Sequence, residues 1–322
     1  ELGLCQPRAL PCLPEAFRER GRWLHPFDSL AQLGHANRVR KTGRQRYYGK
    51  LRMLTSEGGG PFMAPVPAPT LDDLGIQGCL ALAALLMAQH KRIPVAPTRR
   101  HSLAMLHALR EQGIIEAPWP DARWELDPTA EETPIEQIQW RYAWKDYLRP
   151  GLLQALEDFL EEVPHDNYGL ASRIRLWHEL AASEAERFFE SQLARHHFET
   201  SWASDLACVV RDSRQVLPIA QWRYCCWAAT RYGASLAQQL RSTETGVIRE
   251  GIYTELRKRA QRLANGDWSN CAFVPFQPTP ESAASRLFAS KLTRLGAAFW
   301  TLPYEPESLL IARAFTPMTP AE

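Results

Sequence analysis

The chain has 322 residues, of which 45% are hydrophobic and 23% are charged, and this ordinary composition excludes a wholly disordered or fibrous protein. The length suits two domains or one large one with a sizeable buried core. The 38 Lys and Arg residues nearly balance the 36 Asp and Glu residues, so the total charge selects no class of partner and only its distribution along the chain is informative.

Cysteine usage and hydropathy bear on the compartment. The 7 cysteines are odd in number and include no Cys-x-x-Cys pair, which argues against a secreted disulfide framework. The longest apolar run, Leu80 to Met87, is too short to cross a bilayer. We therefore expect reduced thiols, a cytoplasmic location and no membrane partner.

Residues 1–60 are predicted to form an irregular, basic N-terminal arm. The stretch from Arg38 to Arg52 contains seven basic residues and no acid. Basic side chains neutralise phosphates and Tyr rings stack on sugar or base, so this stretch predicts nucleic-acid contact, with a solvated loop or a surface bound to an acidic face of the same chain as alternatives. The expected contact residues of the arm are Arg38, Arg40, Lys41, Arg44, Arg46, Tyr47, Tyr48 and Lys50. The run Gly58-Gly59-Gly60-Pro61 and the prolines after it predict a linker.

Two helices and a short strand are predicted between Leu71 and Ile115. The first helix is apolar nearly all round, as in a helix buried between others. Thr98 is placed to cap the second helix. Leu103, Leu106 and Leu109 share one face of this second helix, which is expected to stop at Gly113.

The order helix, turn, helix, glycine, apolar strand resembles the winged helix-turn-helix family over about residues 71–126, and Leu106, Leu109, Gly113, Ile114 and Ile115 carry the resemblance. The resemblance implies that the N-terminal residues of the second helix, Arg99, Arg100 and His101, meet DNA. The helix dipole disfavours cations in the first turn of a helix. The presence of Arg99 and Arg100 in that turn is easier to understand if they contact phosphate or base edges. The expected wing, residues 116–127, is acidic and would repel phosphate, and such modules also serve in protein docking.

Residues 127–322 are predicted to form a multi-helix domain. Amphipathic patterns predict helices at 135–147, 150–162, 171–196, 218–241, 248–264 and 280–302. Residues 271–276 (CAFVPF) alternate like a strand or form an apolar connecting loop. The expected fold class is therefore mainly α, with a winged-helix-like module at 61–126 followed by this domain.

The predicted helical domain offers little recognisable chemistry. A metalloprotease motif would need a second His at position 182, which is Ala, so no metal site and no cofactor are expected. Cys225 and Cys226 are expected to be small core residues. The acids Glu179, Glu184, Glu186 and Glu190 alternate with Arg187 and Arg195 and are expected to form a solvated helix face.

A second basic surface is expected near the C-terminus. Its members are Arg249, Arg257, Lys258, Arg259 and Arg262, joined in one possible groove by Arg286, Lys291 and Arg294, although such residues also serve solubility alone. The sequence thus predicts a non-enzymatic nucleic-acid-binding and protein-docking subunit of a larger bacterial-type assembly, in a regulatory, mobile-element or defence context. DNA and other protein subunits are the expected partners, the latter docking on Trp residues of the helical domain. The alternatives are a protein-interaction scaffold without DNA binding and an enzyme with a dispersed site, such as a nuclease using Asp205, Asp212 and Glu250.

Overall fold

The computed structural model describes residues 70–116, 135, 138–144, 149–164, 166–212, 216–240, 245–268 and 270–314. The chain divides into two compact units, Glu1–Val66 and Pro67–Glu322, and all described residues belong to the second. The described part is 73% helix and 2% strand, which confirms the expected mainly α class. The basic arm at 1–60 and the expected boundary at 126/127 lie outside the described residues.

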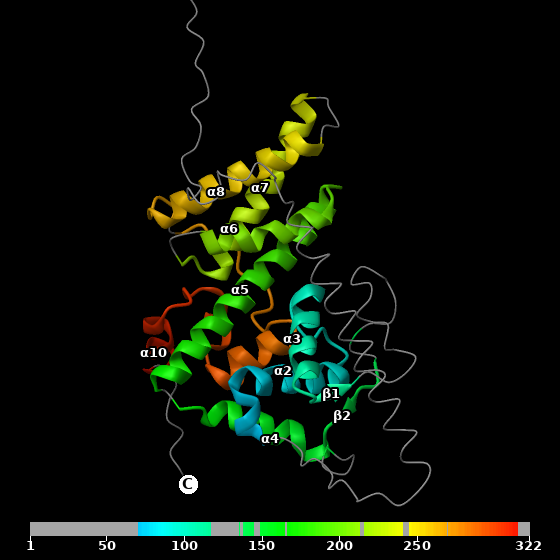
Figure 1. The fold of residues 1–322 in the computed structure, drawn as a ribbon. Coiled ribbons are helices and arrows are strands. Elements are labelled where there is room, and N and C mark those ends of the chain that lie inside the picture. Colours follow the sequence, from blue (N-terminus) through cyan, green and yellow to red (C-terminus); the bar gives the residue numbers. More distant parts are fainter. Residues whose placement is uncertain are drawn as a thin grey trace, which may run out of the picture. The chain divides into compact units, whose positions relative to one another are not determined.

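Two hydrophobic clusters lie along the long helix α5 (Asn167–Arg195), which crosses the middle of the view in Figure 1. The first cluster includes Trp177 and Leu180 of α5, and the second includes Phe189 and Leu193. Around the first cluster lie α2 (Leu71–Lys91), α3 (Arg99–Glu111), α4 (Arg149–Glu162), α9 (Ala283–Leu287) and α10 (Pro306–Ala314). Around the second lie a 3-10 helix η5 (Thr200–Asp205), α6 (Leu206–Asp212), α7 (Ile219–Leu240) and α8 (Thr245–Ala264).

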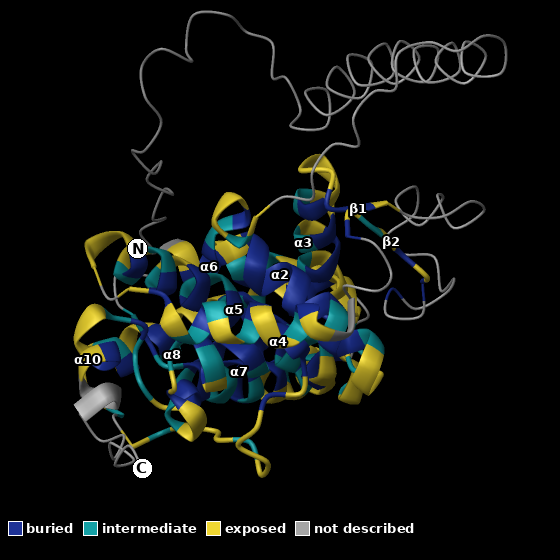
Figure 2. Cartoon of the chain, turned by 90° about the horizontal axis from the view of Figure 1, so that it is seen from below, coloured by how far each residue is buried: buried dark blue, intermediate teal, exposed yellow. Residues whose placement is uncertain are grey.

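Helix α2 is the central helix of the first cluster. Thr70 and Asp73 form a capping box at its start, and twelve of its residues, including Leu82 and Leu85, are buried. Within the described ranges, α2 alone has the length and apolar composition to cross a membrane, but 67% of its most apolar window is buried inside the protein. Figure 2 shows this helix largely in the colour of buried residues, so packing within the fold accounts for its apolar sequence.

The second helix, α3, begins and ends where the sequence predicts. The Thr98 hydroxyl accepts a hydrogen bond from the His101 amide at 3.3 Å, and Gly113 has a φ of +73°, a left-handed conformation that favours glycine and stops the helix. Strand β1 (Ile115–Glu116) follows and pairs antiparallel with β2 (Arg141–Tyr142), Ile115 facing Tyr142. The expected short strand is therefore confirmed.

The prediction of a helix at 135–147 is wrong for the part of this range that the structure describes. Residues 138–144 form a non-helical segment that contains β2. Ile138, Trp140 and Trp144 are buried while the intervening odd-numbered residues are exposed. This two-residue period is that of a strand with one buried face. Gln89 of α2 fixes the segment, since its amide donates to the Ile138 carbonyl at 2.7 Å and the Tyr142 hydroxyl donates to Gln89 at 2.6 Å.

The continuous helix expected at 280–302 is also wrong. The segment breaks into α9, a π-helical turn η6 (Phe288–Leu292) and a 3-10 turn η7 (Gly296–Trp300), with positive φ at Arg294 and Gly296. Its first residues instead donate backbone hydrogen bonds to the connection between α2 and α3, Ala283 to Pro94 and Ala284 to Val95, each at 2.9 Å. The helices expected at 150–162, 171–196, 218–241 and 248–264 are confirmed as α4, α5, α7 and α8, and 271–276 is the connecting loop rather than a strand.

Candidate nucleic-acid interface

The first turn of α3 packs against the middle of α5. The Arg100 guanidinium donates a hydrogen bond from Nη2 to Glu186 Oε2 at 2.6 Å, and a longer one of 3.5 Å from Nη1 to the Ser204 carbonyl. The Thr98 and Ser183 hydroxyls share a hydrogen bond of 3.1 Å across the same junction. The side chain of Glu186 is only 4% exposed, so Arg100 supplies the charge partner of a buried carboxylate.

The other residues predicted to contact nucleic acid lie in different surroundings. Arg99 is exposed at the start of α3. His101 is half-buried, and burial, with a smaller effect of the neighbouring Arg100 charge, lowers its pKa to about 4, so its imidazole is neutral at pH 7. The contact residues expected between Arg38 and Lys50 lie outside the described residues.

The acidic residues of α5, which were expected to form a solvated face, are only partly accessible to solvent. Glu184 and Glu186 are buried, with exposed fractions of 6% and 3%. Burial raises the pKa of both carboxyls, that of Glu186 to about 7. The expectation fails because other elements cover the middle of α5. Arg100 of α3 lies against Glu186, while Arg223 of α7 and Ser285 of α9 lie close enough to Glu184 to oppose part of the pKa rise that burial causes.

A continuous set of arginine and aromatic side chains begins on α7 and includes Phe273 of the loop after α8. The guanidinium carbon of Arg231 is 4.9 Å from the centre of the Trp227 ring, one turn earlier on the helix. The Trp227 ring is 6.0 Å from that of Tyr224 and 6.2 Å from that of Phe273. The guanidinium plane is favourable over an aromatic ring and leaves its edge donors free for an anion.

The same set continues onto α8 and the turn after it. Arg262 lies 4.7 Å above the Trp268 ring, and Arg259 lies 5.4 Å above it. Arg259 also donates a hydrogen bond to the Tyr224 hydroxyl at 3.1 Å, which joins the two helices. We call this set the arginine–aromatic face; its members are Tyr224, Trp227, Arg231, Arg259, Arg262, Trp268 and Phe273.

Ion pairs distinguish the arginines of this region. Arg259 pairs with Glu255 at 2.7 Å, Arg257 lies 3.7 Å from Glu250, and Arg249 pairs with Asp205. Arg231 and Arg262 are exposed and form no ion pair with any residue that the structure describes. Those two are therefore the arginines of the face whose charge is available to a ligand.

The possible groove between α8 and residues 286–294 is not formed. α8 belongs to the second cluster, while the later segment packs in the first. Lys291 pairs with Glu161 at 2.6 Å and Glu157 at 3.3 Å, both on α4, and Arg294 lies 3.5 Å from Glu161. These basic residues neutralise α4 rather than extending the face.

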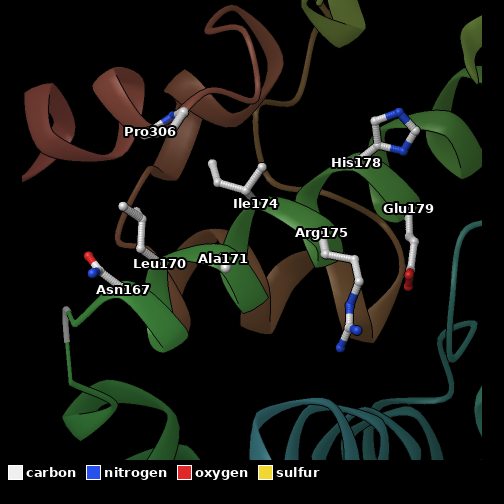
Figure 3. Close-up of a pocket in the computed structure, with 8 residues that line it drawn as sticks. All are labelled: Asn167, Leu170, Ala171, Ile174, Arg175, His178, Glu179 and Pro306. Atoms are coloured by element: carbon white, nitrogen blue, oxygen red, sulfur yellow. The ribbon is translucent and has the colours of Figure 1, made fainter.

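A cavity of about 550 Å³ lies beside the N-terminal half of α5. Its lining residues are Asn167, Leu170, Ala171, Ile174, Arg175, His178, Glu179 and Pro306. In Figure 3 the Arg175 and Glu179 side chains point away from His178 and Ile174, and Arg175 donates to Gln77 of α2 at 3.1 Å. Arg175 and Glu179 therefore lie on one side of α5 and His178 on the other, and the Arg175 charge opposes part of the pKa rise that burial causes at Glu179.

The other chemical candidates are accounted for by packing. Cys225 and Cys226 are fully buried, as expected, and burial raises the pKa of the Cys225 thiol to about 12. No group of three His, Cys, Asp or Glu residues suited to a metal ion occurs in the described part of the chain. Of the acids considered for a dispersed site, Asp205 and Glu250 face arginines, and the Asp212 side chain lies outside the described set.

Arg231, Trp227, Trp268 and Phe273 are members of a surface that the sequence patterns did not predict. The spacing of Trp227 and Arg231, four residues apart on a helix, was an available signal. The Trp residues expected to dock partners are mostly interior: Trp140, Trp144, Trp177, Trp202, Trp222 and Trp300 are buried.

No family model matches the chain, and neither the curated proteins nor the solved structures contain a significant match to it.

Proposed function

We propose that the chain is a non-enzymatic, nucleic-acid-binding and protein-docking subunit of a larger cytoplasmic assembly, and that its arginine–aromatic face contacts the nucleic acid. The observation that carries this proposal is the pairing of Arg231 with Trp227 and of Arg262 with Trp268. Each guanidinium is oriented by a ring and has no carboxylate partner among the described residues. Oriented edge donors of this kind suit phosphate oxygens.

Two further contacts belong to the same proposal. The arm from Arg38 to Lys50 supplies additional charge for phosphate. In this proposal α2, α3 and the β1–β2 pair act as a winged-helix-like unit, and Arg99, which is exposed at the start of α3, supports a contact there. Arg100 contributes less, because a phosphate would have to compete with buried Glu186 for its donors.

A test compares anisotropy titrations of a labelled oligonucleotide with the wild type and with the double variant Arg231→Ala, Arg262→Ala. We expect the double variant to bind at least about tenfold more weakly, since each lost phosphate contact removes electrostatic affinity. The matched control is Arg249→Ala, an arginine on α8 that is paired with Asp205, and it should change affinity less than about twofold. Undetectable binding of the wild type at low salt, or equal effects of the two variants, would overturn the proposal.

A protein-interaction scaffold is the second candidate. Leu240 and Val247, at the end of α7 and the start of α8, are 45% and 47% exposed, and Tyr232, about two turns before the end of α7, is 45% exposed. Apolar side chains gathered at one end of a helical hairpin suit a protein partner. Substituting Leu240 and Val247 by Ser should abolish a partner contact without changing oligonucleotide affinity, which separates the two candidates.

A further inference from the structure

The loop after the arginine–aromatic face holds the most exposed aromatic ring in the described part of the chain. Phe276 is 101% exposed, and Phe273 and Val274 are 40% and 48% exposed. Two hydrogen bonds anchor the loop: the Phe273 amide donates to the Ala220 carbonyl at 2.8 Å, and the Trp300 indole donates to the Pro278 carbonyl. The Phe276 ring is therefore presented to solvent by a segment fixed at both ends.

From this arrangement we propose that the arginine–aromatic face takes an unpaired strand of nucleic acid in preference to a duplex, with Phe276 stacking on its bases and Phe273, whose ring packs against Phe188 and Trp227, holding the loop in place. This inference rests on the proposed function. Every base has an aromatic face, so stacking on a protein ring gives affinity with little dependence on base sequence. In a duplex those faces are already stacked on neighbouring bases, and only base edges and phosphates are accessible.

The spacing of the rings and arginines suits one strand. Phe273 lies 6.2 Å from the Trp227 ring, which in turn lies 4.9 Å from the Arg231 guanidinium. Phe276 follows Phe273 by three residues, and three residues of extended chain span at most about 10 Å. Phosphate donors and the stacking ring thus lie within a few nucleotides of one another along a single strand.

Charge favours nucleic acid over a protein partner at this loop. Arg231 lies over Trp227, the ring that Phe273 contacts. Burying the Arg231 guanidinium against an apolar protein surface would remove its charge from water without supplying an anionic partner, and this desolvation costs free energy. A strand of phosphates supplies the opposite charge, so the same ligand satisfies both the arginine and the exposed ring.

The test uses the full chain and three labelled probes of equal length: a mixed-sequence single strand, its duplex, and a strand made of abasic sites. We expect the single strand to bind at least about fivefold more tightly than either of the other probes. Phe276→Ala should weaken single-strand binding roughly 5- to 150-fold, the usual range for loss of one base–aromatic stack, and leave the abasic strand unchanged. Leu310→Ala, a control at a 62% exposed apolar residue of α10, should have no effect.

The outcomes distinguish this inference from the function it rests on. If all three probes bind equally, depend on Arg231 and Arg262, and are indifferent to Phe276→Ala, the nucleic-acid function stands and the single-strand inference is wrong. If no probe binds at low salt, both are wrong. If Phe276→Ala changes only the sedimentation behaviour of the protein, the loop contacts another protein chain and the inference is overturned.

Discussion

Arg100 of α3 donates a 2.6 Å hydrogen bond to Glu186 of α5, whose side chain is 4% exposed while that of Arg100 is 57% exposed. An arginine that the sequence marks as a nucleic-acid contact is thus the charge partner of a buried acid. The bond ties α3, which packs in the first hydrophobic cluster, to the part of α5 where the second hydrophobic cluster begins. Ala185, next to Glu186, is the first residue of α5 that belongs to the second cluster.

Removing the arginine should destabilise this junction. In Arg100→Ala the Glu186 carboxyl stays buried without its charged donor, and we expect the free energy of unfolding to fall by about 1–3 kcal/mol. Chemical denaturation measures the change. Arg175→Ala, which removes an exposed hydrogen bond to Gln77 and a charge near Glu179, should cost under about 1 kcal/mol. Adding Glu186→Gln to Arg100→Ala should recover part of the loss, and strictly additive effects would contradict a coupled pair.

Glu186 also predicts a pH dependence of stability. Burial raises its pKa from the ordinary 4.5 to about 7, against the opposing effect of Arg100. The folded state therefore holds this proton to higher pH than the unfolded state does. Its contribution to stability is complete below about pH 4.5 and is lost as pH rises to about 7. Between these values the unfolding free energy of the wild type should fall more steeply than that of Glu186→Gln.

Denaturation curves at pH 5, 6 and 7 provide the measurement for that slope. Glu184, whose pKa is also raised, titrates in both proteins, whereas the charge of Glu190 acts on Glu186 directly, so the difference between the two profiles reports Glu186 together with its coupling to Glu190. Parallel pH profiles of wild type and variant would show that Glu186 is solvated in solution.

Close packing of α7 on α8 depends on two glycines. A Cβ added at Gly233 would lie 2.6 Å from Ile252 Cδ1, and one added at Gly251 would lie 2.6 Å from Leu236 Cδ2. Because Ile252 is fully buried, Gly233→Ala should lower the unfolding free energy by about 1–3 kcal/mol, although Ala favours a helix by about 1 kcal/mol. Gly246→Ala, with nothing within 4 Å of the added carbon, should be neutral or stabilising, and an equal loss in both variants would refute the steric explanation.

The hydrogen bond between Tyr142 and Gln89 should hold β2 against α2. Tyr142→Phe removes only the hydroxyl that donates at 2.6 Å, and we expect a loss of about 1 kcal/mol together with faster amide exchange at Tyr142 and Ala143. Tyr168→Phe is the matched control, because that ring is 73% exposed. Unchanged exchange at Ala143, whose amide donates to the Ile114 carbonyl at 3.0 Å, would argue that the strand is held by its apolar contacts alone.

Local signals in the sequence predicted α3 well. The Thr98 cap, the Leu103, Leu106 and Leu109 face and the Gly113 stop all depend on contacts within a few residues, and each is present in the structure. The buried pair Cys225 and Cys226 was equally predictable, since small apolar residues in an aromatic helix pack inward.

Features that depend on distant contacts were not predictable in the same way. Residues 138–144 carry a two-residue period, but aromatic residues also suit a helix, and the pairing with β1 and Gln89 decides the outcome. Glu184 and Glu186 resemble surface residues in sequence, and only the docking of α3 and α9 buries them. The arginine–aromatic face joins α7, α8 and a loop, so its members are adjacent only after folding.

The salt dependence of oligonucleotide binding tests the central claim most directly. The logarithm of the association constant falls linearly with the logarithm of salt concentration, with a slope set by the number of phosphates that the protein neutralises. We predict that Arg231→Ala with Arg262→Ala makes this slope shallower by about 1.4 for a single strand, two contacts at about 0.7 each, whereas Arg249→Ala leaves it unchanged. A slope that is the same in wild type and double variant would contradict the assignment of phosphate contact to the arginine–aromatic face.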